Sequence, residues 1–350
     1  MLALLLAAAL LQPHAYLQEI WKSSGTPGIA VAVAVKGEIV YADGAGFAEL
    51  ENRVPATPKT VWNIGSVSKV ITAVAVMQLV ERGKVSLDDP IQKYVPEFPV
   101  KPEGTITIRH LLTHTSGIRH YKRGDFPGTP DNENTRPMSW LDGLKIFADE
   151  PLQFAPGARY LYSSYAVNLL QGVVERASGE PFEQYLTENV WRPAGMAATA
   201  FDVPARIVPQ RARSYRIVNG APANYFYNDL TYKFASGGMM SSVEDLVRFG
   251  AAFNHGQLVK RETIAQIAAP QLKTGEFEQG LMWRIFRDAN GRTFLNHCGS
   301  VKGFNACVVD YPSEDVVVAL AGNGEDATPA RRAAVAFAQF FLKQRAPVSR

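Results

Sequence analysis

Strand-like segments lie near both ends of this chain, and a long helix-rich stretch separates them. Residues 28–35 (Gly-Ile-Ala-Val-Ala-Val-Ala-Val) form an apolar run, and residues 39–49 resume a strand after a turn, which indicates a hairpin. Further strands are expected near the C-terminus, over residues 281–285, 293–297, 306–310 and 316–320. This pattern predicts an α/β fold in which the two chain ends together build one sheet domain.

The stretch between the two groups of strands is predicted to be an inserted, mainly helical domain. A chain of 350 residues is long enough for one large domain or two. We expect the sheet domain to comprise residues 16–80 and 236–345, and the helical domain to comprise residues 81–235. Helices are expected over residues 107–117, 139–148, 166–177 and 181–191, in segments between 241 and 268, and over 329–343. The Pro- and Gly-rich residues 121–137 are expected to form a loop, which is either a lid or pocket wall or a disordered surface excursion.

The segment around Ser66 is the strongest candidate for a reactive site. Apolar side chains recur after it at helical spacing, at Val67, Val70, Ile71, Val74, Met77 and Val80. Gly83 is a plausible stop for this helix. Because residues three apart share a helical face, Ser66 and Lys69 are expected to point the same way at the helix N-terminus.

A serine and a lysine in this arrangement suit nucleophilic chemistry. A serine hydroxyl is a poor nucleophile until a base takes its proton, and a lysine amine is a base only when it is neutral. Burial and neighbouring cations lower the pKa of a lysine and so favour the neutral form. The backbone N–H of Ser66 can then stabilise an oxyanion. A Ser-x-x-Lys pattern alone is weak evidence, since a solvated lysine near a helix start gives the same pattern.

The N-terminal residues 1–15 resemble a secretory signal peptide. Residues 1–11 are almost wholly apolar but too few to cross a bilayer, so no integral membrane span is expected. The prediction is a periplasmic or secreted protein, with a cytoplasmic location as the alternative. The competing structural interpretation is an N-terminal helix packed on the domain.

The chain has two cysteines, Cys298 and Cys307, which flank a predicted strand turn. Two cysteines are too few for a disulfide framework. A cross-strand bridge would suit an exported protein, but we expect free thiols because Cys298 falls within a candidate active-site segment.

Charge and histidine content argue against several other functions. The net charge of +3 comes without a Lys/Arg cluster, so nucleic-acid binding is not indicated. His110 and His114 are four residues apart, but no glutamate lies between them as in a zincin motif. We therefore predict structural histidines and neither a metal site nor an organic cofactor.

Three short segments occur in the order of the motifs of the penicillin-recognising serine hydrolases. They are Ser66-Val67-Ser68-Lys69, Tyr162-Ser163-Ser164 and His297-Cys298-Gly299. The sequence resembles the branch with class C β-lactamases, D-Ala-D-Ala carboxypeptidases, D-aminopeptidases and related carboxylesterases, and in places its mitochondrial β-lactamase-like members. Similar segments lie at 94–99, 111–121, 154–157 and 299–304, so the resemblance covers residues 28–323. It implies an antiparallel sheet flanked by helices, the β-lactamase/transpeptidase-like fold.

The resemblance also implies roles for individual residues. Ser66 would be the acylated nucleophile, Lys69 its base partner and Tyr162 a proton relay to the hydroxyl and the leaving group. The backbone N–H groups of Ser66 and Ser300 would form the oxyanion hole. The remaining motif residues, Ser164, His297, Cys298 and Gly299, would contact substrate.

The motifs depart from the family pattern at three positions. Ser164 replaces an asparagine that orients substrate, and Cys298 replaces a threonine. His297 replaces a lysine, and because histidine is mostly neutral at pH 7, capture of a β-lactam carboxylate is weakened. We therefore expect a serine hydrolase acting on esters or small peptides, with β-lactamase or carboxypeptidase activity as the alternative.

Two alternatives of other classes stay open at this point. The chain would be a catalytically weak assembly or binding protein, as in the filament-forming mitochondrial branch, and a homo-oligomer is compatible with either function. An α/β-hydrolase fits less well, because the sequence contains no Gly-x-Ser-x-Gly elbow.

Overall fold

One large antiparallel sheet is the central feature of the computed structural model, which describes residues 2–129, 133–226, 228–324 and 328–342. The strand order is β3-β2-β1-β14-β13-β12-β11-β10-β9. The strands of this sheet are β1 (Gly28–Val35), β2 (Glu38–Glu49), β3 (Val54–Pro55), β9 (Leu272–Lys273), β10 (Glu278–Gln279), β11 (Arg284–Arg287), β12 (Thr293–Val301), β13 (Phe304–Tyr311) and β14 (Val316–Gly322).

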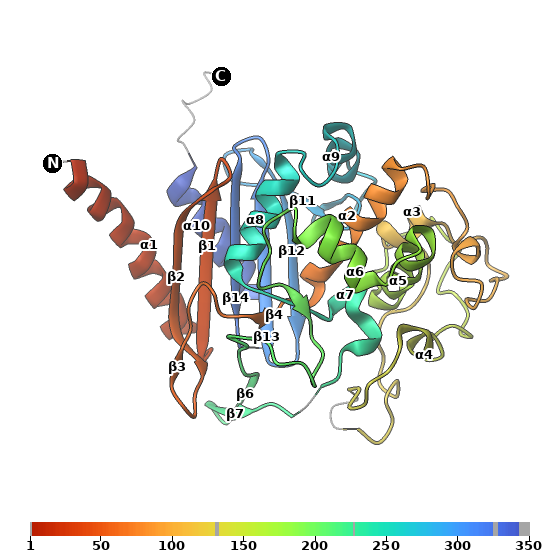
Figure 1. The fold of residues 1–350 in the computed structure, drawn as a ribbon, viewed down its shortest axis with the longest axis horizontal. Coiled ribbons are helices and arrows are strands. Elements are labelled where there is room, and N and C mark those ends of the chain that lie inside the picture. The colour runs from red at the N-terminus through yellow and green to blue at the C-terminus, as the bar shows by residue number, and fades with distance from the viewer. Residues whose placement is uncertain (1, 130–132, 227, 325–327, 343–350) are drawn as a thin grey trace.

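The two chain ends meet in the middle of this sheet. Strand β1 pairs with β2 on one side and with β14 on the other, in a register that joins Ile29 to Gly322 and Val35 to Val316. Red and blue strands therefore lie side by side in Figure 1. The prediction of an antiparallel sheet built from both ends is confirmed.

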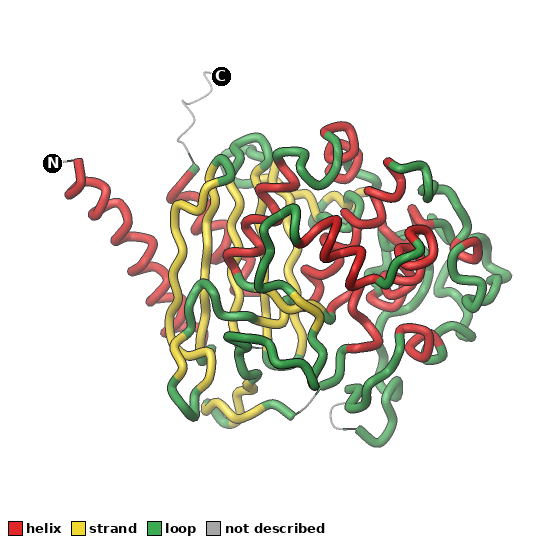
Figure 2. Tube along the Cα trace, viewed as in Figure 1, coloured by secondary structure: helices red, strands yellow, loops and turns green. Residues whose placement is uncertain are grey.

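Both faces of the sheet are covered, which explains the continuous apolar sequence of β1. Side chains alternate between faces along a strand, so Ala30 and Ala32 pack into the main core and Val31 and Val33 into a second core. Helix α8 covers the first face, and α10 together with α1 covers the second (Figures 1 and 2). A strand buried on both sides needs no polar alternation.

The helices mostly gather on one side of the sheet. They are α1 (Leu2–Ser24), α2 (Ser68–Glu81), α3 (Ile108–Leu112), α4 (Trp140–Leu144), α5 (Ser164–Ser178), α6 (Phe182–Leu186), α7 (Phe234–Gly237), α8 (Val243–Asn254), α9 (Arg261–Ala268) and α10 (Thr328–Phe341). Short helical turns are η1 (Gly65–Val67), η2 (Ile91–Lys93), η4 (Thr187–Trp191) and η5 (Thr231–Lys233). Figure 2 shows the stretch between residues 81 and 235 as mainly helices and loops.

Short strands within the helical stretch were not expected from the sequence. Strand β5 (Ala200–Phe201) joins β4 (Trp62–Asn63) and β8 (Met239–Ser241) in a small sheet, and β6 (Tyr215–Val218) pairs with β7 (Ala221–Asn224). The proposed boundaries at residues 80 and 236 stay a prediction.

Two predicted elements end or begin elsewhere. Helix α3 stops at Leu112 rather than near Gly117, because His114 adopts a left-handed backbone conformation (φ 57°) that ends the helix. The strand predicted over 281–285 begins at Arg284, because Met282 is also left-handed (φ 66°) and its N–H donates to the carbonyl of Leu112.

The N-terminal residues form helix α1, whose last turns pack against the sheet. Leu17 is fully buried in the second core, and the ring of Tyr16 lies 5.1 Å from that of Phe337 on α10. Among the residues described, no helix is both long enough and apolar enough to span a bilayer. The signal-peptide prediction for residues 1–15 and the predicted location are tested by neither observation.

Candidate active site

Ser66 lies in a tight turn directly before α2. The preceding Gly65 has a φ of 48°, and its N–H donates to the side-chain oxygen of Asn63 at 2.8 Å. The hydroxyl of Ser68 donates to the carbonyl of Gly65 at 2.7 Å and so braces the same turn. Ser66 therefore belongs to the turn η1 and not to the first turn of the helix, but the buried helix predicted from the apolar spacing does follow it.

Lys69 is fully buried and reaches three oxygens from three segments of the chain. Its Nζ lies 3.0 Å from Ser66 Oγ, 3.0 Å from Ser164 Oγ and 2.6 Å from the carbonyl oxygen of Ser236. An ammonium would donate to all three oxygens. A neutral amine would donate to two of them and accept the proton of Ser66.

The surroundings of Lys69 favour its neutral form. Burial lowers its pKa to about 7, an effect that Tyr121 opposes and the positive charges of Lys233 and Arg284 reinforce. With a pKa near neutrality, a large share of Lys69 is deprotonated at pH 7 and available as a base.

Tyr162 is the second hydrogen-bond partner of Ser66 Oγ. Its phenol donates to Ser66 Oγ at 2.7 Å, and Lys69 Nζ lies 5.0 Å from the centre of its ring. Burial raises the pKa of Tyr162, while its contacts with Ser66, Arg284, Ser164 and Lys233 lower it. The structure thus brings together the three side chains predicted from distant motifs.

Two neutral histidines pack around the ring of Tyr162. Their ring centres lie 4.5 Å (His114) and 5.3 Å (His120) from that of Tyr162. The N–H groups of Ser163 and Ser164, where α5 begins, donate to Nδ1 of His114 and His120 respectively. Burial lowers the pKa of His120 to about 4 and that of His114 well below its usual value. Both rings therefore carry their proton on Nε2.

The predicted oxyanion hole lies where β12 passes against the Ser66 turn. A Cβ built on Gly299 would lie 2.4 Å from the backbone nitrogen of Ser66, and one on Gly65 would lie 2.8 Å from that of Ser300. Only glycines allow this approach, which brings the two proposed N–H donors onto adjoining backbone segments. Their joint action on an oxyanion stays a prediction.

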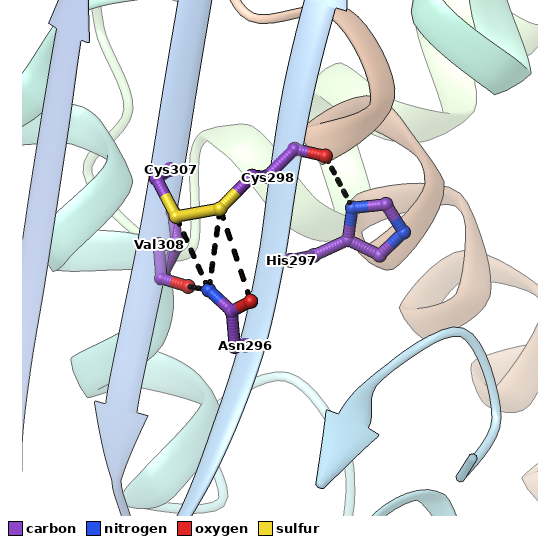
Figure 3. The surroundings of a disulfide bond; sticks show 5 residues. All are labelled: Asn296, His297, Cys298, Cys307 and Val308. Carbon is purple, nitrogen blue, oxygen red and sulfur yellow. Dashed lines mark hydrogen bonds between the residues drawn. A yellow bond between two sulfur atoms is a disulfide. The ribbon is translucent and has the colours of Figure 1, made fainter. Parts of the chain in front are cut away.

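The expectation of free thiols is wrong, because Cys298 and Cys307 form a disulfide. They are directly opposite each other on β12 and β13, where cross-strand side chains on one face come close together. Figure 3 shows the disulfide between the two strands, with the side-chain amide of Asn296 donating to Cys307 Sγ at 3.2 Å and to the Val308 carbonyl at 2.8 Å.

Strand alternation separates the two motif side chains on β12. The sulfur of Cys298 packs in the second core on the α10 side, so the proposed contact of this side chain with substrate is not supported. His297 points to the other side of β12 in Figure 3, its Nδ1 bonded to the Cys298 carbonyl at 3.0 Å. Its ring lies 6.5 Å from that of Tyr162, and it is 1% exposed. Burial, followed by the charges of Arg284 and Lys69, lowers its pKa well below the usual value.

A cleft of about 360 Å³ opens in front of Ser66. Tyr162, Ser164 and Ser300 line it, and so do His120 and Lys233, which the motif comparison missed. His120 lies in the loop after α3, within the segment 111–121 that resembles the family but to which no role was assigned, and Lys233 lies in the turn η5, which has no motif. A second missed cation, Arg284 on β11, lies 5.5 Å from the centre of the Tyr162 ring. No spacing rule links these positions to Ser66.

The histidines that raised the question of a metal are separated by the end of α3. The side chain of His110 helps to cap that helix through Thr107, whereas His114 lies beside Tyr162. Within the described part of the chain, no group of three or more His, Cys, Asp or Glu residues is arranged to hold a metal ion.

Comparisons with known proteins agree with this geometry. A family model described as Beta-lactamase matches residues 14–340. Human mitochondrial serine beta-lactamase-like protein LACTB is 34% identical over 85% of this chain and 71% of its own length. Esterase EstB of Burkholderia gladioli is 32% identical over 73% of each chain. The octameric penicillin-binding protein homologue from Pyrococcus abyssi superposes with a TM-score of 0.83 at 28% identity, over 95% of this chain and 77% of that one.

Proposed function

This chain belongs to the β-lactamase family and is a serine hydrolase of that family, and we propose that it acts on esters or small peptides through an acyl-enzyme on Ser66. One observation carries the proposal: the oxygen of Ser66 lies within hydrogen-bond distance of both Lys69 Nζ (3.0 Å) and the Tyr162 phenol (2.7 Å). A nucleophile with an adjacent base and an adjacent proton donor is the arrangement that acyl transfer needs.

In the proposed reaction, the neutral amine of Lys69 takes the proton of Ser66 while the serine oxygen forms a bond to the substrate carbonyl carbon. The resulting oxyanion accepts hydrogen bonds from the N–H groups of Ser66 and Ser300; such a donor typically contributes about 3–4 kcal/mol. The bond to the leaving group then breaks, and Tyr162 donates the proton that the leaving group needs. Lys69 then returns the proton it took from Ser66 to the Tyr162 phenolate by way of the Ser164 hydroxyl, whose oxygen lies 3.0 Å from Lys69 Nζ and which also contacts the phenol.

Hydrolysis of the acyl-enzyme completes the cycle. Water attacks the ester carbonyl as Lys69 takes one of its protons, the bond from Ser66 Oγ to the acyl carbon breaks, and Ser66 regains its proton. The products are a carboxylic acid and the alcohol or amine released earlier. Lys69 therefore acts as a base in both halves, which requires a pKa near neutrality; its pKa is about 7.

Esters and small peptides are favoured over β-lactams for two reasons. The relative EstB carries the name esterase. In addition, His297 is neutral at the position where the penicillin-recognising motif has a charged lysine, because burial and nearby cations lower its pKa. β-Lactam turnover is the second candidate, since relatives include an Escherichia coli protein named Beta-lactamase at 29% identity.

We also propose self-association and export. The octameric state of the Pyrococcus abyssi homologue favours a homo-oligomer. A periplasmic or secreted location rests on the apolar character of residues 1–11.

Covalent labelling of Ser66 tests the proposed function. The protein is incubated with a fluorophosphonate, or with 4-nitrophenyl esters, and its intact mass is measured. We expect one adduct per chain in the wild type, none in Ser66→Ala, and an unchanged adduct in Ser313→Ala, which removes an exposed serine in the β13–β14 turn. Equal labelling of Ser66→Ala would exclude Ser66 as the nucleophile.

A further inference from the structure

We propose that Lys233 binds a negatively charged group of the substrate, so that the preferred ester or peptide carries a carboxylate close to the bond that is cleaved. The inference rests on the proposed function and makes its substrate class more specific. Nothing in the three sequence motifs assigns a role to this residue.

Lys233 is a buried cation that has no anionic partner in the described part of the chain. It is 5% exposed and lines the cleft in front of Ser66. Among the described residues, no carboxylate forms an ion pair with its ammonium and no oxygen accepts a hydrogen bond from it. Its ammonium lies over two aromatic rings, those of Tyr121 and Tyr232, whose centres lie 4.8 Å and 5.4 Å from Nζ.

An arrangement of this kind suits a ligand. Burying an ammonium without a partner is costly, and aromatic faces compensate only part of that cost. The rings hold the charge in position but accept none of its three N–H groups in a full hydrogen bond. A carboxylate that enters the cleft would supply the missing acceptors and the missing negative charge.

The other charges of the cleft wall favour the same ligand. Lys302, in the turn between β12 and β13, lines the cleft and is only half-buried, and no carboxylate pairs with it within the described residues. Among the described residues of the wall, Glu133 is the acidic one, and it forms an ion pair with neither lysine. In this described part of the wall, two lysines thus accompany one carboxylate. Lys69 is not counted, because Ser66, Ser164 and the Ser236 carbonyl already contact it.

The position of Lys233 differs from that of the motif lysine that is missing here. The missing lysine would stand at residue 297 on β12, where His297 is buried and neutral. Lys233 comes instead from η5, directly before the α7 segment that provides the Ser236 carbonyl to Lys69. An anion bound by Lys233 would therefore be held at a different wall of the cleft from an anion bound by a lysine at position 297.

Matched pairs of esters test this inference and locate the anion. The first pair puts the charge on the acyl side: 4-nitrophenyl hemiglutarate and its neutral glutaramate analogue. The second pair puts the charge on the leaving group: 4-acetoxybenzoate and 4-acetoxybenzamide. The quantity measured is the ratio of kcat/KM for the charged member to that for the neutral member. Any effect of Lys233 on the pKa of Lys69 changes kcat/KM by the same factor for both members of a pair, so it cancels in this ratio.

We expect wild-type enzyme to prefer the charged member of at least one pair by tenfold or more. The preference should be lost in Lys233→Met, retained in Lys233→Arg, and unaffected in Lys260→Met, an exposed lysine before α9. The pair that shows the preference identifies the side of the substrate that carries the anion. Glu133→Gln should increase the same preference.

Two results would overturn the inference: no preference for the charged member of either pair, or the same preference in Lys233→Met as in wild type. Failure of the proposed function looks different, because then neither member of any pair is hydrolysed and Ser66 is not labelled. In that case, binding of the same four esters to Ser66→Ala, measured by calorimetry, decides the inference. Tighter binding of a charged member that depends on Lys233 supports it, and equal binding overturns it.

Discussion

Replacing Lys69 by methionine should stabilise the protein at acidic pH and stabilise it much less at alkaline pH. The substitution keeps the length of the side chain and removes a charge that is completely buried. Burial lowers the pKa of Lys69 from 10.5 to about 7. Lys69 therefore binds its proton more tightly in the unfolded chain than in the folded protein. For this reason, the free energy of unfolding is lower when Lys69 is protonated.

The size of the effect follows from the two pKa values. At pH 6 the shift costs the folded state about 5 kcal/mol, and at pH 9, where the folded lysine is already neutral, it costs about 2 kcal/mol. Methionine cannot donate to the three oxygens that Lys69 contacts, among them the Ser236 carbonyl. Losing these hydrogen bonds offsets about 1–3 kcal/mol of the gain in stability at every pH. We therefore expect Lys69→Met to be more stable than wild type by about 2–4 kcal/mol at pH 6. This advantage should shrink by about 3 kcal/mol by pH 9.

Urea denaturation of the two proteins at pH 6, 7.5 and 9 measures this difference. Other groups titrate over this range, but they are common to both proteins and cancel in the comparison. Lys260→Met is the matched control, because its lysine is exposed and its effect should not depend on pH. A constant difference between wild type and Lys69→Met from pH 6 to pH 9 would show that Lys69 titrates normally, and the proposed role of its neutral amine would then be untenable.

Two further outcomes are expected from the same structure. The rate of Ser66 labelling by a fluorophosphonate should rise about tenfold between pH 6 and pH 8 as Lys69, with a pKa of about 7, loses its proton; a rate that stays flat in stopped-flow measurements would contradict this. Burial raises the pKa of Asp310 to about 8, so its contribution to stability is lost as pH rises from about 4 to 8. The stability of Asp310→Asn relative to wild type should therefore increase with pH, and at pH 7 the gain should be no more than about 4 kcal/mol. Thermal denaturation of both proteins at pH 5 and pH 8 measures this gain. The same difference in stability at both pH values would refute the raised pKa of Asp310.

The large elements of the fold could be predicted from local sequence because their burial leaves a periodic trace. Strand β1 was predicted at its observed bounds from one apolar run, and the helix predicted over 166–177 is α5, with bounds of 164 and 178. The end of α3 could not be predicted, because a left-handed residue at His114 has no signature in a non-glycine sequence. The contacts that fix such a residue come from distant segments.

At the candidate active site, too, some features could be predicted from the sequence and others could not. Ser66, Lys69 and Tyr162 were found because short motifs carry them, and the structure brings their side chains within bonding distance. Lys233 and Arg284 were missed because neither lies in a motif that assigns it a role, although Arg284 belongs to a segment that was predicted to be a strand. The disulfide was considered and wrongly rejected because Cys298 lies within a motif. Strand alternation places its side chain opposite Cys307, on the face of β12 away from His297.

The pairing of β1 with β14 has a consequence for the order in which the chain is built. During synthesis the hairpin of β1 and β2 is made about 270 residues before β14, the other neighbour of β1, at a typical pace of ~5–20 residues per second. Until then an edge of unpaired backbone and two bare apolar faces are available to wrong partners. A polypeptide released before residue 316 would contain every catalytic group proposed here. It would still lack β14, the strand that pairs with both β1 and β13 and so joins the two ends of the chain in one sheet.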